Sequence, residues 1–162
     1  MILRLSLDLP EDESLTVMVR HLSRTLLETL HVASQDIDDL EYVIGELTAN
    51  AVRHSGDDFY TIGLDLYKDK AVVTVTDRGK GFLFEDLPLP GSSRPDEHGE
   101  ERFGGWGLPL VQKLADRVEF FRTEPQGTTV RAEKQLRYDL WGTPAGTQET
   151  TDETDPEQKA KP

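Results

Sequence analysis

The sequence predicts an α+β fold, a two-layer α/β sandwich with helices on one face of a mixed, mostly antiparallel sheet. Apolar residues recur at a spacing of two in some segments and of three to four in others, which separates strands from helices. The resulting order is strand, helix, helix, strand, strand, helix, strand, strand. Strands that follow one another in pairs favour hairpins, and neighbouring helices need one sheet face to cover.

The length and composition predict one folded domain followed by a tail. The chain has 162 residues, of which 36% are hydrophobic and 30% are charged, enough for one domain with a sizeable core. We expect this domain to occupy residues 1–141. Residues 142–162 contain few apolar side chains and many Thr, Glu, Asp, Gln and Pro, which predicts an acidic, disordered tail.

The charge and the absence of cysteine exclude several functions. A formal net charge of -13 argues against nucleic-acid binding, which needs clustered Lys and Arg to neutralise phosphates. The chain has no cysteine, so disulfides, thiolate metal sites and thiol nucleophiles are excluded. No stretch has the length and apolar character of a membrane span or a signal peptide, so we expect a cytoplasmic protein.

The first third of the chain predicts a strand and two helices. Leucines alternate with polar residues over 3–9, and Pro10 closes a strand suited to a sheet edge. Asp12 or Ser14 can cap a helix that ends near His31, with apolar residues at Leu15, Met18, Val19, Leu22, Leu26 and Leu30. A second helix is predicted from Ser34 to about His54, with an apolar face of Ile37, Leu40, Ile44, Leu47 and Ala51.

The rest of the chain predicts a hairpin, a long loop, a short helix and a second hairpin. Residues 60–66 and 71–76 alternate or are rich in β-branched side chains, and they flank a turn at 68–70. Residues 83–103 lack periodicity, which is typical of a lid or a disordered loop. A helix then begins at Leu108, and strands follow at 118–123 and 128–136.

The second helix carries a polar stripe. Glu46, Asn50 and His54 step by four and therefore lie above one another on one face. Such a stripe either lines a site or faces solvent. For His54, which lies at the predicted helix end, capping and a role near phosphates remain equal alternatives.

Two glycine-containing segments could bind a nucleotide. Asp77 ends a strand and is followed by Gly79 and Gly81, which fixes a carboxylate beside backbone that a ligand can approach closely. An ionised Asp accepts from the amine of adenine and repels the carbonyl oxygen of guanine. Residues 104–107 enter a helix and offer N–H groups to phosphates. Taken singly, each segment also fits an ordinary turn.

In combination, these motifs resemble the GHKL (Bergerat-fold) ATP-binding domain of DNA gyrase, MutL and histidine kinases. The N box of that family matches Glu46, Asn50, Ala51 and His54, and its glycine boxes match Asp77, Gly79, Gly81, Gly105, Gly107 and Leu108. Gly127 and Thr128 match a further Gly-Thr pair, and the resemblance covers roughly residues 1–138. It implies that ATP binds with Mg²⁺ on Asn50, that Asp77 and Thr128 hold adenine, and that Glu46 acts on the attacking hydroxyl or water.

Within this family, the short chain most resembles the anti-sigma-factor serine/threonine kinases. That resemblance implies a homodimer that binds a sigma factor and phosphorylates a serine of an antagonist protein. It also implies that residues 83–103 form a lid, in which Arg94 and Arg102 either contact phosphates or are merely solvated. Two alternatives stay open. One is a non-catalytic module in which ATP gates protein binding, and the other is a stand-alone histidine-kinase-like domain with slow ATPase activity.

Overall fold

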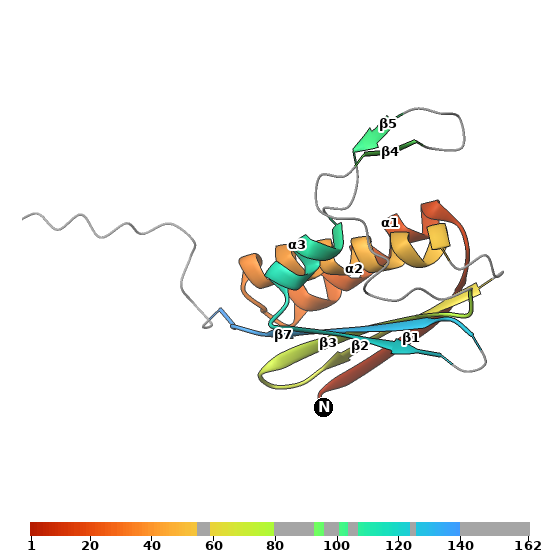
Figure 1. The fold of residues 1–162 in the computed structure, drawn as a ribbon. Coiled ribbons are helices and arrows are strands. Elements are labelled where there is room, and N and C mark those ends of the chain that lie inside the picture. The colour runs from red at the N-terminus through yellow and green to blue at the C-terminus, as the bar shows by residue number, and fades with distance from the viewer. Residues whose placement is uncertain (55–58, 80–92, 96–100, 104–106, 124–125, 140–162) are drawn as a thin grey trace, which may run out of the picture.

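The described part of the chain forms the predicted two layers, with three helices on one face of an antiparallel sheet (Figure 1). The computed structural model describes residues 1–54, 59–79, 93–95, 101–103, 107–123 and 126–139. The predicted fold class is confirmed. The predicted tail, residues 142–162, lies outside the described residues. Among the described residues, no helix is long and apolar enough to cross a membrane.

The main sheet has five strands in the order β1-β2-β3-β7-β6, and all four pairings are antiparallel. Its strands are β1 (Leu3–Pro10), β2 (Phe59–Leu66), β3 (Lys70–Asp77), β6 (Arg117–Arg122) and β7 (Thr128–Gln135). The prediction that the first strand lies at an edge is correct. β3 and β7 lie side by side in the middle of the sheet, so the two predicted hairpins join there.

The helices begin and end close to the predicted positions. α1 (Glu13–Thr29) is capped by Asp12, whose side chain accepts a hydrogen bond from the Ser14 N–H. After α1, His31 has a φ of 57°, the left-handed conformation in which helices often end. α2 (Ser34–His54) and α3 (Gly107–Leu114) complete the layer.

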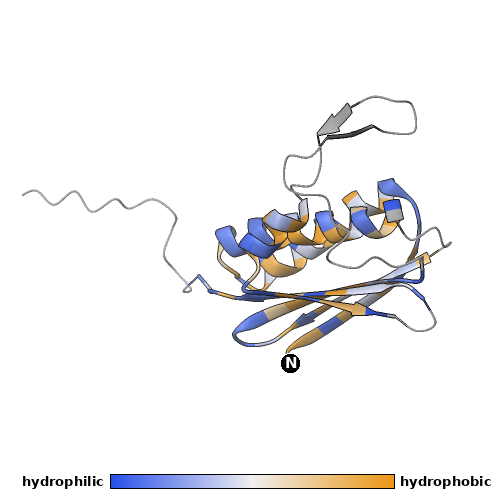
Figure 2. Ribbon diagram, in the orientation of Figure 1, coloured by the Kyte–Doolittle hydropathy of each residue, from blue (hydrophilic) through white to orange (hydrophobic). Residues whose placement is uncertain are grey.

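The core lies between the helical layer and the sheet, where apolar faces of both layers meet (Figure 2). The predicted apolar faces of α2 and β2 are buried to within a few per cent of their surface: Ile37, Leu40, Ile44, Leu47, Ala51, Tyr60, Ile62, Leu64 and Leu66. α2 packs against α1, α3 and the sheet, so it is the central element of the fold. A polar side chain on α2 is therefore placed by packing on several sides.

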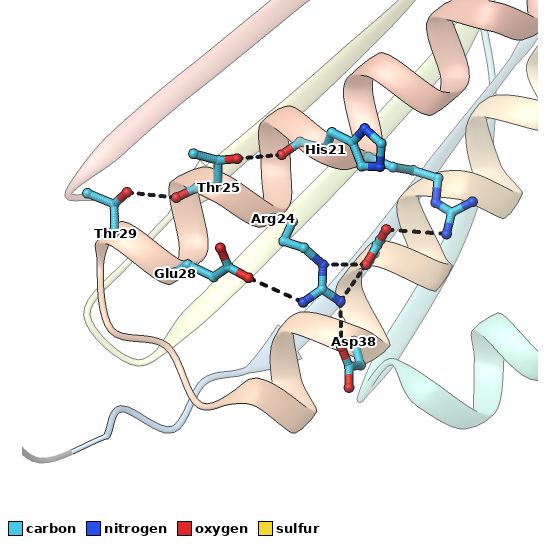
Figure 3. A network of polar contacts seen from close by, with 8 residues as sticks. His21, Arg24, Thr25, Glu28, Thr29 and Asp38 are labelled. Carbon is cyan, nitrogen blue, oxygen red and sulfur yellow. Dashed lines mark hydrogen bonds and ion pairs between the residues drawn. The ribbon is translucent and has the colours of Figure 1, made fainter. Parts of the chain in front are cut away.

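An ion-pair network ties α1 to the N-terminal half of α2 (Figure 3). Arg24 donates to Glu41 at 2.7 Å and also pairs with Glu28 and Asp38, while Arg20 donates to the same Glu41 at 3.3 Å. The acidic partners of Arg24 raise the pKa of its guanidinium. The network fixes the two helices side by side.

A second ion pair, between Asp36 and Arg137, joins the start of α2 to the chain after β7. The Asp36 carboxylate, only 2% exposed, accepts hydrogen bonds from the backbone N–H and the guanidinium of Arg137, each at 2.7 Å. Burial raises the pKa of Asp36, but the hydrogen bonds and charge of Arg137 outweigh this effect and leave the pKa below its ordinary value. The ionised form of Asp36 thus stabilises the fold.

The prediction of an irregular loop over 83–103 is wrong in two places. Two short strands, β4 (Ser93–Pro95) and β5 (Glu101–Phe103), pair antiparallel and form a separate two-stranded sheet. Strands of three residues are too short to show an alternating pattern, which explains why the sequence did not reveal them. The backbones of Arg94 and Arg102 lie opposite each other in this pairing.

Candidate nucleotide site

A pocket opens where the C-terminal half of α2, the start of α3 and the strands β3 and β7 meet. Its lining residues are Leu47, Asn50, Ala51, Val75, Asp77, Leu108 and Val130. Three of them, Asn50, Asp77 and Leu108, come from the three separate motifs of the sequence. The fold therefore brings the N box and both glycine boxes to one place.

Asp77 is held at the end of β3 by backbone N–H groups. Its side chain is buried, and its Oδ1 accepts hydrogen bonds from the N–H of Gly79 at 3.0 Å and of Thr128 at 3.3 Å. The bond from Gly79 is the Asx turn expected of an Asp followed two residues later by a turn residue. Thr128, itself buried, brings the first residue of β7 against this carboxylate. Both contacts orient Asp77 in the pocket wall.

Gly127 allows the start of β7 to lie close to the backbone of Asp77. Its φ is +119°, and a Cβ at this position would lie 2.2 Å from the backbone oxygen of Asp77. Neither the conformation nor the space suits any other residue. The sequence singled out Gly127 only as half of a Gly-Thr pair, and its physical role becomes visible in the structure.

Asn50 offers the pocket an unsatisfied polar atom. Its Nδ2 is buried and has no hydrogen-bond partner within the described part of the chain. A buried amide nitrogen without a hydrogen-bond partner destabilises a folded protein, so such an atom in a pocket is a candidate ligand contact. Since the oxygen and nitrogen of an amide can exchange places by a flip of the side chain, Asn50 can present an oxygen to this space.

Glu46 lies one helical turn before Asn50 and contacts the start of α3. A Cβ built on Gly107 would lie 1.8 Å from Glu46 Oε1 and 2.1 Å from Cδ. The carboxylate therefore rests directly on the Gly107 backbone, in space that any side chain would fill. Helix N-termini favour negative charge, so this is a favourable place for a carboxylate.

Lys134 of β7 fixes α3 in this position. Its ammonium donates to the backbone oxygen of Leu114 at 2.9 Å and pairs with Asp39 of α2 at 2.8 Å. The side chains of Lys134 and Asp39 are each 13% exposed, so the pair is shielded from solvent. A cation at the C-terminus of α3 complements the helix dipole. No pattern or motif in the sequence points to this residue.

The remaining predicted site residues are only partly described. Gly81 and Gly105 lie outside the described residues, and His54 is the last residue of α2. The alternatives for His54, and the phosphate contacts expected of Arg94 and Arg102, stay predictions. Within the described part of the chain, no group of three or more His, Cys, Asp or Glu side chains could hold a metal ion.

Comparisons with known proteins agree with this geometry. The family model of the histidine kinase-like ATPase domain matches residues 9–134. A serine-protein kinase RsbW of Bacillus cereus is 26% identical over 141 residues, covering 83% of this chain and 86% of its own length. A serine-protein kinase RsbW of Staphylococcus aureus is 29% identical over 109 residues, covering 63% and 67%.

Two solved structures share the fold at low sequence identity. The RsbU and RsbW domains of a Mycobacterium tuberculosis protein superpose with a TM-score of 0.60 and 20% identity, over 83% of this chain and 32% of that one. The SiaB–SiaC complex of Pseudomonas aeruginosa gives a TM-score of 0.54 and 13% identity, over 81% of this chain and 89% of that one.

These findings define an ATP-binding domain of the GHKL class. The chain belongs to the histidine kinase-like ATPase domain family, and within it the chain resembles the anti-sigma-factor kinases. The family prediction made from the three motifs is therefore confirmed.

Proposed function

We propose that this protein is an ATP-dependent serine/threonine kinase of the anti-sigma-factor type, acting on a serine of an antagonist protein. The observation that carries the proposal is the position of Glu46. Its carboxylate lies at the N-terminus of α3, one turn of α2 from Asn50 and beside the pocket that contains Asp77. A general base is thus adjacent to the place assigned to the phosphates.

Adenine occupies the pocket in this proposal. Asp77 accepts a hydrogen bond from the exocyclic amine, and Thr128 lies beside it. Leu108, Val75 and Val130 supply apolar contact for the ring. The backbone N–H of Gly107, at the start of α3, is proposed to face the phosphates, as expected where a glycine-rich segment enters a helix.

Asn50 is the proposed protein ligand of Mg²⁺. Mg²⁺ prefers oxygen ligands and is usually held by one or two protein groups together with phosphate oxygens and water. The buried, unpartnered Nδ2 position of Asn50, which a flip of the amide exchanges with the oxygen, supports that role. When bound, the ion neutralises phosphate charge, which an acidic chain with a net charge of -13 otherwise repels.

The proposed reaction is an in-line transfer of the γ-phosphoryl group. The serine hydroxyl oxygen forms a bond to the γ-phosphorus, and the bond from that phosphorus to the β–γ bridging oxygen breaks. The bond's electron pair stays on ADP, and the hydroxyl proton passes to Glu46. Such reactions depend mainly on positioning and charge neutralisation, both of which this site offers.

The partners are proposed from resemblance. Relatives named serine-protein kinase, matched over two thirds or more of their length, support a protein serine as acceptor. A sigma factor and its antagonist are proposed as partners from the resemblance to the anti-sigma-factor kinases. Homodimerisation and a cytoplasmic location belong to the same proposal. The acidic charge is consistent with protein partners, since nucleic acid would be repelled.

Glu46→Gln tests the proposal, because glutamine keeps the shape of the side chain but cannot accept the proton. We expect turnover to fall by roughly 10²–10⁴ while ATP affinity, measured by calorimetry, changes little. Asp77→Asn is the matched variant, which should weaken ATP binding by about 1.5–3 kcal/mol and abolish the preference over GTP.

The outcomes separate the alternatives. Equal turnover in wild type and Glu46→Gln would remove Glu46 from the chemistry. Nucleotide-dependent partner binding without any phosphotransfer would favour the gated binding module. ATP hydrolysis that no protein acceptor can capture would favour the slow ATPase. Equal affinity for ATP and GTP would overturn the role of Asp77.

A further inference from the structure

β1 leaves one side of the main sheet open. Within the described part of the chain, β1 pairs with β2 on one side and with no strand on the other (Figure 1). The backbone N–H and C=O groups along such an edge can pair with a further strand. Leu3, Leu5 and Leu7 are only partly buried, and Met1 and Ile2 are 66% and 53% exposed. The edge therefore presents both hydrogen-bonding groups and apolar surface.

α1 has an apolar face that points away from α2. Arg20 and Arg24 both donate to Glu41 of α2, so their side of α1 faces that helix. Met18 and Leu22 each lie two residues before one of these arginines, and two residues of a helix are separated by about 200° around its axis. Met18 and Leu22 therefore face away from α2, and they are 44% and 43% exposed.

This face of α1 lies above the open edge of β1. α3 contacts β6 at one edge of the sheet, and α2 contacts β2, β3 and β7, so α1 covers the part next to β1. α1 begins just after β1, and Val32, beyond its end, pairs with Tyr138. Tyr138 donates to Tyr67, which follows the residue paired with Leu3. α1 therefore runs back along β1, and the middle of the helix lies level with the middle of the strand.

The sequence of β1 is complementary to itself in one register. When two copies pair antiparallel about Ser6, Arg4 of each copy lies opposite Asp8 of the other, and Leu5 lies opposite Leu7. The two charged residues share the exposed face of β1, and the leucines share the opposite face, so matching faces meet. Centring the pair on Leu5 or Leu7 loses the opposition of Arg4 and Asp8.

β6, the other edge of the sheet, lacks this complementarity. Pairing two copies of β6 about Glu119 sets two carboxylates opposite each other, which is unfavourable. Pairing them about Phe120 sets Arg122 opposite Val118 and matches no charges. Self-pairing is therefore favoured at β1.

We propose that two copies of this chain pair through β1 about a twofold axis at Ser6, which joins two five-stranded sheets and keeps both helical layers on one side. This inference rests on the homodimerisation included in the proposed function and assigns the surface that forms it. Arg4, 61% exposed beside Asp65, also binds Asp8 of the other copy. The exposed apolar faces of the two α1 helices meet above the strand pair. Each copy uses the same patch, as in most homodimers.

Cysteine cross-linking tests the position of the axis, because the chain has no cysteine of its own. In the full chain with oxidised glutathione, Ser6→Cys should form a disulfide-linked dimer, since Cα atoms opposite each other across strands lie about 5 Å apart. Asp8→Cys is the matched control on the same face of β1. Its two copies would lie four strand residues apart, about 13 Å, and should not link. Equal linking of both variants, or no linking of Ser6→Cys, refutes the register.

Sedimentation velocity tests the surface itself. Wild type should sediment as a dimer, and Asp8→Lys should weaken the dimer about tenfold, because both Arg4–Asp8 pairs become repulsive. Asp69→Lys, a matched reversal in the turn between β2 and β3, should leave the dimer unchanged, and thermal unfolding checks that both variants fold.

The outcomes separate this inference from the kinase function. A monomeric wild type refutes the dimer, and a dimer that Asp8→Lys leaves intact refutes the β1 surface. Phosphotransfer to a protein acceptor is measured independently on the same samples. A monomer that phosphorylates its acceptor refutes the pairing alone, whereas a β1-paired dimer without phosphotransfer refutes the kinase function alone.

Discussion

Gly107→Ala should inactivate the enzyme without unfolding it. The added methyl group would lie 1.8 Å from Glu46 Oε1 and 2.7 Å from Cγ, distances that no pair of non-bonded atoms sustains. The backbone of Gly107 does not have a positive φ, and alanine is favourable in a helix, so α3 itself tolerates the change. The strain must therefore be relieved by the Glu46 side chain.

The size of the effect follows from how far that side chain must move. Ordinary contacts between non-bonded atoms lie near 3.5 Å, so the carboxylate has to retreat by about 1.5 Å. A displacement of about 1 Å can cost a reaction a factor of about 10². Because the far end of Glu46 is flexible, the free energy of unfolding should change by less than about 1 kcal/mol, as for most substitutions that create no buried cavity or unpaired charge.

A double-mutant cycle shows whether the glycine acts through Glu46. Phosphotransfer rates are measured for wild type, Gly107→Ala, Glu46→Gln and the double variant, with thermal unfolding as the folding control. If the clash is the cause, Gly107→Ala costs about 10² in wild type and almost nothing after Glu46→Gln, since the misplaced group no longer works. Equal costs in both backgrounds would refute this reasoning and assign the glycine to phosphate binding. Gly63→Ala, where an added Cβ would meet its nearest neighbours at an ordinary contact distance of 3.9 Å, should leave the rate unchanged.

Two further predictions concern stability. Gly127→Ala should lower the free energy of unfolding by at least about 2 kcal/mol in chemical denaturation. The φ of Gly127 is +119°, and a Cβ there would lie 2.2 Å from the Asp77 backbone oxygen, so neither the conformation nor the space accepts a side chain. An unchanged denaturation midpoint would contradict this prediction. Asp36, whose pKa is lowered in the folded state by Arg137, should stabilise the protein at neutral pH and lose that contribution as the pH falls below about 4. Asp36→Asn should lower the free energy of unfolding by about 1–3 kcal/mol at pH 7 and reduce its dependence on pH below about 4. If the stability of wild type and of Asp36→Asn depends on pH in the same way, the stabilising role of the Asp36–Arg137 ion pair is refuted.

Most of the fold could be predicted because each element buries one face. Because of that burial, apolar residues recur every two positions in β1 and β2 and every three to four positions in α1 and α2. This spacing is visible in the sequence itself. β4 and β5 have three residues each, which is too few to show an alternating pattern in the sequence. The pairing of β3 with β7 depends on contacts distant in the chain, which a local pattern cannot reveal.

The predicted site was incomplete for the same reason. The motifs predicted Glu46, Asn50 and Asp77 as site residues because their residue types and spacing suit nucleotide chemistry. They did not reveal what holds these residues in place. Lys134, which ties α3 to α2, is separated from Asp39 by most of the chain and resembles any other lysine in a strand. Its importance appears only when the three elements are seen together.

Two glycines of this site are required by close contacts within the protein. The sequence patterns predict that glycines let the backbone approach a ligand closely, with Gly79 beside Asp77 and residues 104–107 near phosphates. In the structure, Gly127 is required by the approach of β7 to Asp77, and Gly107 is required by the carboxylate of Glu46. Both close contacts are made within the protein and do not depend on a bound nucleotide. The packing of α2 against α3 and of β3 against β7 therefore sets the positions of Glu46, the proposed base, and of Asp77, the carboxylate proposed to bind adenine, in the protein without ATP.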